Sequence, residues 1–72
     1  MTDLETLAAA MADDWNLHHV GRSPDGRWFA QLVRGGEHSA DRVVEKGATP
    51  AEAIAATLRA WAAKQALADL LA

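Results

Sequence analysis

The stretch Gly47-Ala48-Thr49-Pro50-Ala51-Glu52-Ala53-Ile54 decides the fold, because it opens a segment that continues to Ala72 without another glycine or proline. The Thr49 side chain can accept a hydrogen bond from the Glu52 amide, and the Glu52 carboxylate can reach back to the Thr49 amide. Pro50 stands at the first helical position, where its missing N–H costs nothing. Further along, Ile54, Leu58 and Trp61 recur at helical spacing among alanines. The stretch therefore predicts a helix over about residues 50–71 that lays one apolar stripe on a sheet.

The start of the chain predicts a shorter helix over about residues 3–13. Thr2 and Glu5 repeat the capping-box spacing. The apolar residues that follow have the i, i+3, i+4, i+7 spacing of one helix face: Leu4, Leu7, Ala8 and Met11. Asp13 and Asp14 mark the expected end of this helix, where negative charge opposes the helix dipole.

Three strands are expected between the helices, over about residues 15–20, 27–34 and 40–46. A turn cluster at residues 21–26 separates the first two, and a glycine-rich turn at residues 35–39 separates the last two. In the first strand, strict alternation places Trp15 and Leu17 on one face and Asn16, His18 and Val20 on the other. His18 and His19 should then point to opposite faces and not share a metal ion.

The second strand carries apolar residues on both faces, as expected of a central strand. Trp28, Ala30 and Leu32 alternate to one side, and Phe29 and Val33 to the other. The predicted fold class is α+β in the order αβββα, with a three-stranded antiparallel meander and two helices packed on one face. The alternative is one helix on each face, a three-layer αβα arrangement. The one-face arrangement leaves Phe29 and Val33 as an open apolar surface.

Composition indicates one small domain with few large apolar groups. The chain has 72 residues, 17 of them alanine, no cysteine and a net charge of −3. The absence of cysteine excludes disulfides, thiolate zinc sites and cysteine nucleophiles. The acidic start lacks the basic region of a signal peptide, and no apolar run approaches the roughly 20 residues that span a bilayer. We therefore expect a cytoplasmic protein without a membrane partner.

The titratable residues do not form a recognisable catalytic or ligand-binding pattern. Asp13, Asp14 and His38 lie at the ends of expected elements, and nothing in the sequence makes them converge. Ser23 and Ser39 lie in turns. The Gly35-Gly36 pair leads into a strand, whereas loops that cradle phosphate open onto a helix N-terminus. We expect no enzyme activity, no cofactor, no metal and no small-molecule substrate.

Five apolar residues are the predicted partner-binding set: Phe29, Val33, Leu67, Leu70 and Leu71. At about 100° per residue, the three leucines lie roughly 160–260° from Ile54 on the helical wheel, away from the stripe that faces the sheet. A helix of 22 residues is also about 33 Å long, whereas a seven-residue strand spans roughly 23 Å, so the helix should overhang the sheet. The expected partner is another protein or a second copy of this chain.

Nucleic-acid binding is the alternative function, through five basic residues: Arg22, Arg27, Arg34, Arg42 and Lys46. A duplex usually requires a clearly basic face. Nucleic acid is not the expected partner, because the chain is acidic overall and because Arg27 and Arg34 alternate to opposite sides of their strand.

Two segments resemble small phage and prophage proteins of the phage ABA-sandwich type. They are the run Asp25-Gly26-Arg27-Trp28-Phe29-Ala30 and the helix start at residues 47–54, continuing to Ala60. These proteins pair a Trp-containing strand with a Thr-Pro-x-x-Ala helix start, and the resemblance covers about residues 15–62. It implies a phage or prophage protein of unknown cellular role, with no activity to transfer to any position.

Two weaker resemblances concern the same order of elements. The chain is similar to the double-stranded RNA-binding domain, whose second helix opens with a phosphate-gripping lysine cluster; here those positions are Thr49, Pro50, Ala51 and Glu52. The helix start also resembles that of HicB-type antitoxins, with Gly47, Thr49, Glu52 and Ala53 at the matching spacing, although the Pro-Gly-Cys segment is absent. The first resemblance implies RNA binding and the second implies a protein-binding role.

Overall fold

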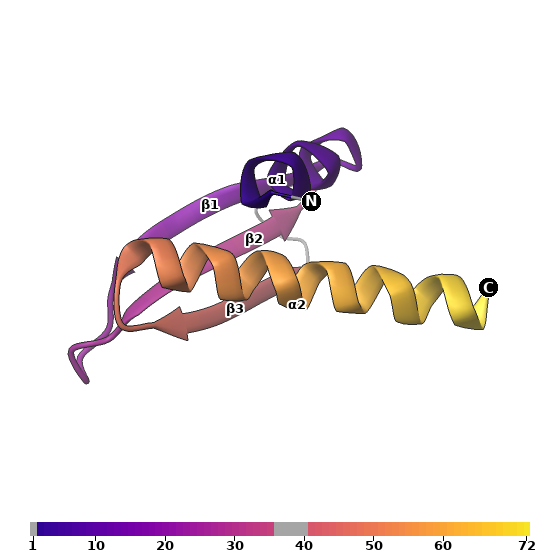
Figure 1. The fold of residues 1–72 in the computed structure, drawn as a ribbon. Helices are drawn as coiled ribbons and strands as arrows, with labels where there is room; N and C mark the ends of the chain where they lie inside the picture. The colour runs from indigo at the N-terminus through magenta and orange to yellow at the C-terminus, as the bar shows by residue number, and fades with distance from the viewer. Residues whose placement is uncertain (1, 36–40) are drawn as a thin grey trace.

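The computed structural model describes residues 2–35 and 41–72, which form two helices and three strands. Figure 1 shows them in chain order: α1 (Asp3–Ala12), β1 (Trp15–Arg22), β2 (Trp28–Arg34), β3 (Arg42–Gly47) and α2 (Pro50–Leu71). This order confirms the predicted α+β fold. The expected start of the third strand at Ala40 and the expected turn at residues 36–39 lie outside the described residues.

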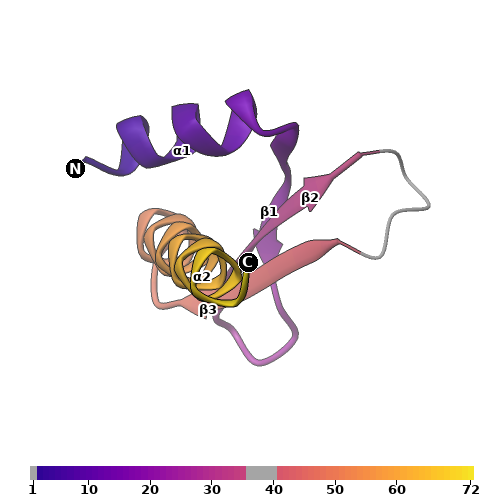
Figure 2. The same cartoon turned by 90° about the vertical axis from the view of Figure 1, so that its right-hand side faces the viewer.

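The sheet is an antiparallel meander in the order β1-β2-β3, so β2 is the central strand. Leu32 of β2 pairs with Leu17 of β1 and with Val43 of β3, which places these three side chains on one face. Both helices lie on that face, with α1 crossing above α2 in Figure 2. The one-face arrangement predicted from the sequence is therefore the one observed, and the opposite face of the sheet has neither helix over it.

One core lies between the sheet and the two helices. Its buried residues come from every layer: Ala10 of α1, Trp15, Leu32 and Val43 of the sheet, and Leu58 and Trp61 of α2. A buried polar contact fixes α2 against β2, because the Thr57 hydroxyl oxygen lies 2.9 Å from the Ala30 carbonyl oxygen. Small residues at Ala30 and Ala53, both fully buried, let the helix approach the sheet closely.

Both helix starts are capped by the expected threonines, with one difference in detail. At α1 the capping box is complete: the Glu5 amide donates to the Thr2 hydroxyl (3.1 Å), and the Thr2 amide donates to the Glu5 carboxylate (3.0 Å). At α2 the Glu52 amide donates to the Thr49 hydroxyl (3.1 Å), as predicted. The Glu52 carboxylate, however, accepts from the Ala48 amide (3.1 Å), not from that of Thr49.

The alternation predicted for the first strand is wrong from His19 onwards, because the strand contains a β-bulge. The register shifts between Leu17, which pairs with Leu32, and His19, which pairs with Gln31. One extra residue reverses the alternation that follows it. Val20 therefore pairs with Ala30 and lies on the helix-covered face, not the opposite one. His18 and His19, which were expected on opposite faces, lie on the same uncovered face.

Candidate interaction surfaces

The C-terminal end of α2 extends past the end of the sheet (Figure 1). All of α2 lies within the described residues, and its buried residues end at Trp61. Beyond that point Leu67 is 58% exposed, Leu70 82% and Leu71 80%. We call residues 66–72 the overhang. The structure thus places the three predicted leucines together on the exposed C-terminal end of α2.

Trp15 marks the place where α2 leaves the sheet. The Lys64 ammonium lies 5.4 Å from the centroid of the Trp15 ring, and the Arg34 guanidinium lies 5.8 Å from it. These are cation–π distances. The Trp15 side chain is 2% exposed. The overhang therefore begins immediately after a well-packed junction between α2, β1 and β2.

The side of the sheet opposite the helices, which we call the open face, is the second candidate surface. Its central row consists of Phe29, Gln31 and Val33, and the β3 row consists of Arg42, Val44 and Lys46. Phe29 and Val33 are half-buried, whereas Val44 is 44% exposed. The open face is therefore more polar than the apolar surface that we expected from the sequence.

An aromatic pair lies on the open face. The rings of His19 and Phe29 stack with their centroids 5.2 Å apart and their planes 25° apart. A Cβ atom at Gly21 would lie 2.9 Å from His19 Nε2 and 3.2 Å from Phe29 Cζ. Glycine at position 21 is thus what allows the two rings to approach the backbone of β1.

The five basic residues of the alternative function divide between the two faces. Arg42 and Lys46 belong to the open face, and alternation places Arg27 on the same side. Arg22 lies over the ring of Trp28, at 5.7 Å from its centroid. Arg34 forms ion pairs with Asp41 (3.2 Å) and Asp13 (3.9 Å). The opposite orientation of Arg27 and Arg34 agrees with the sequence analysis, but three of the five cations share one side.

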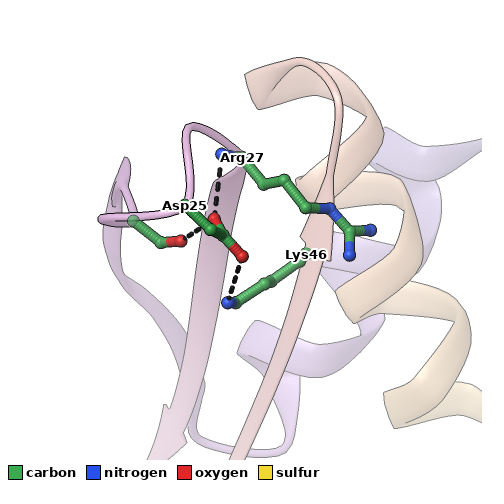
Figure 3. A network of polar contacts seen from close by, with 4 residues as sticks. Asp25, Arg27 and Lys46 are labelled. Atoms are coloured by element: carbon green, nitrogen blue, oxygen red, sulfur yellow. Dashed lines mark hydrogen bonds and ion pairs between the residues drawn. The ribbon is translucent and has the colours of Figure 1, made fainter.

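The turn between β1 and β2 is organised by Asp25 (Figure 3). Its carboxylate accepts hydrogen bonds from the Ser23 hydroxyl and from the Arg27 amide (3.0 Å), and it pairs with the Lys46 ammonium (3.1 Å). The Ser23 bond, followed by those of Arg27 and Lys46, holds the pKa of Asp25 well below its usual range. Asp25 and Ser23 therefore have a structural role in this turn, and Lys46 connects the turn to β3.

The remaining candidates from the sequence do not converge. Asp13 is paired with Arg34, and His38 and Ser39 lie outside the described residues. Within residues 2–35 and 41–72, no three His, Cys, Asp or Glu side chains come together as metal ligands would. Over the same residues, neither helix has the combined length and apolar character that crossing a bilayer requires.

Two features of these surfaces were missed by sequence reasoning. Leu4 (76% exposed) and Met11 (54%) were assigned to the buried stripe of the first helix, yet of that stripe Leu7 is the large residue that packs against the core. The second missed feature is the bulge in β1, which brings His19 to the open face beside His18. A signal for the bulge existed in Val20, an apolar residue at a position that alternation assigns to the side away from Trp15 and Leu17.

Comparisons of the chain with known protein families, with curated proteins and with solved structures found no match.

Proposed function

We propose that the protein is a small non-catalytic interaction module, of phage or prophage type, that associates with a second copy of itself through the overhang. The observation that carries the proposal is the exposure of Leu67, Leu70 and Leu71 together on a helix end beyond the sheet. Exposed apolar clusters of this kind are typical of protein–protein contacts. The phage or prophage type is supported by the sequence resemblance.

A twofold arrangement of two overhangs fits the pattern of these residues. In such a contact the same patch is used on both chains, so the three leucines of one copy face those of the other. The exposed Ala63 and Ala66 beside them would let the two helices approach closely. The first half of α2 remains packed on the sheet in such a dimer, so association requires no unfolding.

The energetics favour a weak dimer. Full burial of one leucine side chain contributes about 1.5–3 kcal/mol, and a twofold contact would bury six. Association costs an estimated 4–15 kcal/mol in lost freedom of motion. The two terms are of similar size, so the fraction of dimer should depend on protein concentration.

The open face is a poorer surface for self-association. Stacking two copies through it would take the exposed Arg42 side chain out of water. A charge buried in an interface without an acidic partner is unfavourable. We therefore assign Leu67, Leu70 and Leu71 to the contact with a second copy, and leave Phe29 and Val33 out of that contact.

Light scattering over a range of concentrations tests this proposal. We expect the average mass to rise from monomer towards dimer, and the double variant Leu67→Gln/Leu71→Gln to remain monomeric. Glutamine keeps good helix propensity and adds no charge near the helix C-terminus, so the helix itself should persist. Circular dichroism checks that it does.

Leu4→Gln is the matched control, since Leu4 is exposed to a similar extent but lies on α1. We expect it to dimerise like the wild type. A wild-type protein that stays monomeric at every concentration, or a double variant that still dimerises, contradicts the proposal.

A further inference from the structure

The open face has a charge that differs from that of the whole molecule. The chain carries a net charge of −3. Yet none of the open-face positions of the three strands, all of them described residues, holds Asp or Glu; Glu45, the one acidic strand residue, alternates to the helix side. Arg42 and Lys46 occupy two of the three positions in the β3 row. The open face is therefore a basic surface on an acidic protein.

Among the described residues, ion pairs with carboxylates involve one strand cation on each side of the sheet. Arg34, on the helix side, is paired with Asp13 and Asp41. Lys46 shares its charge with Asp25 at the turn. Arg42 is exposed, and the ion pairs found within residues 2–35 and 41–72 do not include it. A ligand with negative charge would thus find Arg42 available, with Lys46 on the same strand and Arg27 at the neighbouring turn.

The aromatic pair adds a second recognition element to the same face. His19, in β1, is exposed and stacks on the half-buried Phe29 of the central strand β2. The β3 row with its cations is two strand spacings away from β1, about 10 Å. Ordinary alternation after Leu17 places His18 on the same face, and the bulge places His19 there. An aromatic platform beside a line of cations combines a surface for planar rings with a surface for anions.

We propose that the open face binds single-stranded nucleic acid. Bases stack on the His19–Phe29 pair, and phosphates contact Arg42, Lys46 and Arg27. Every base has an aromatic face, so such binding tolerates many sequences. A duplex keeps its base faces stacked inside and cannot use the aromatic pair, so a single strand is the form that fits.

This mode differs from that of the double-stranded RNA-binding domain, which the chain resembles in its order of elements. The start of α2, which carries Glu52 and no lysine, takes no part in it. The overhang also takes no part, so the proposed dimer and the proposed nucleic-acid site use different surfaces. Each can fail without the other.

Fluorescence anisotropy with a labelled oligothymidine strand tests the proposal at low salt. We expect binding whose affinity falls with salt, with a log–log slope of about −1.4 to −2.1, as two or three phosphate contacts imply for a single strand. Loss of one stacking contact in His19→Ala should weaken binding at least about fivefold. Charge reversal in Arg42→Glu should weaken it by about tenfold or more.

Arg59→Glu is the matched control, because it makes the same charge change at an exposed position of α2. We expect it, and the Leu67→Gln/Leu71→Gln variant, to bind within about twofold of the wild type. Circular dichroism shows whether each variant is folded. If His19→Ala does not fold, Phe29→Leu provides a second test of stacking. An excess of duplex of the same sequence should compete poorly.

Three results would overturn the proposal. They are no binding at low salt, binding that His19→Ala and Arg42→Glu leave unchanged, and equal competition by poly-glutamate. The last result would mean that the face attracts any polyanion by charge alone, as an acidic protein partner would require.

Discussion

At the scale of single residues, Asp25 organises the turn between β1 and β2. Its carboxylate joins Ser23, the Arg27 amide and Lys46, residues from the turn and from a strand 21 positions away. The residue types and the turn were predictable from the sequence. The pairing with Lys46 was not, because it depends on the register between β2 and β3, which places Lys46 opposite Phe29.

The stability contributed by Asp25 should depend on pH. The hydrogen bonds from Ser23 and the Arg27 amide, with the Lys46 ammonium, keep the pKa of Asp25 lower in the folded chain than in the unfolded one, where it is about 3.9. The contribution is therefore fully present above the unfolded pKa and is lost as the pH falls through the folded pKa. We expect Asp25→Asn to be less stable than the wild type at pH 7, and the difference to shrink below about pH 4.

Urea unfolding of both proteins at neutral and acidic pH measures that difference. Asp69→Asn is the control, because Asp69 lies exposed on the overhang and should alter the free energy of unfolding by less than about 0.5 kcal/mol at either pH. A difference between wild type and Asp25→Asn that stays constant with pH would show that the carboxylate charge contributes nothing.

At the scale of elements, the helices were predictable because their signals are local. The Thr49–Glu52 and Thr2–Glu5 spacings fix helix starts within a few residues, and both helices begin where these signals place them. The bulge in β1 was not predictable in this way. It is defined by pairing with β2, so a strand considered alone gives the ordinary alternation and assigns His19 and Val20 to the wrong faces.

The contact between β3 and α2 depends on Gly47. A Cβ atom at this position would lie 2.6 Å from the Ala53 nitrogen and 2.8 Å from the Glu52 carbonyl carbon, both of them backbone atoms that cannot turn aside. Gly47→Ala must therefore push the first turn of α2 away from the sheet. We expect a loss of about 1–3 kcal/mol in the free energy of unfolding, the usual range for overpacking.

Gly26→Ala separates this steric effect from backbone strain. Gly26 has a φ of 87° and open space around its Cβ position, so its substitution should cost about 1–2 kcal/mol through backbone conformation alone. Denaturant unfolding of both variants gives the two costs. If Gly47→Ala were as stable as the wild type, the close approach of α2 to β3 would not be required for the fold.

At the scale of the whole molecule, the sequence predicted that Leu67, Leu70 and Leu71, though not Leu4, would be exposed and which side of the sheet would lack helices. Both follow from helix length and from alternation in β2, a strand without a bulge. The charge of the open face was not predictable, because it depends on how three strands are aligned. Arg42 and Lys46 come together with His19 through pairings between strands, which composition does not report.

A chain of 72 residues buries only about 60% of the surface of its unfolded form, so its stability should be small and sensitive to association. If the folded chain dimerises through the overhang, mass action links Tm to concentration. Once dimer predominates, a hundredfold rise in concentration adds about 1.4 kcal/mol per chain. For a domain of this size, that corresponds to an increase in Tm of about 5–10 °C.

Differential scanning calorimetry at low and high protein concentration measures this increase. In Leu67→Gln/Leu71→Gln the Tm should not change with concentration, and at low concentration it should equal that of the wild type, because the buried residues of α2 end at Trp61. A lower Tm in the dilute variant would mean instead that the leucines stabilise the monomer. The test thus shows whether Leu67 and Leu71 stabilise a contact between two chains or the fold of a single chain.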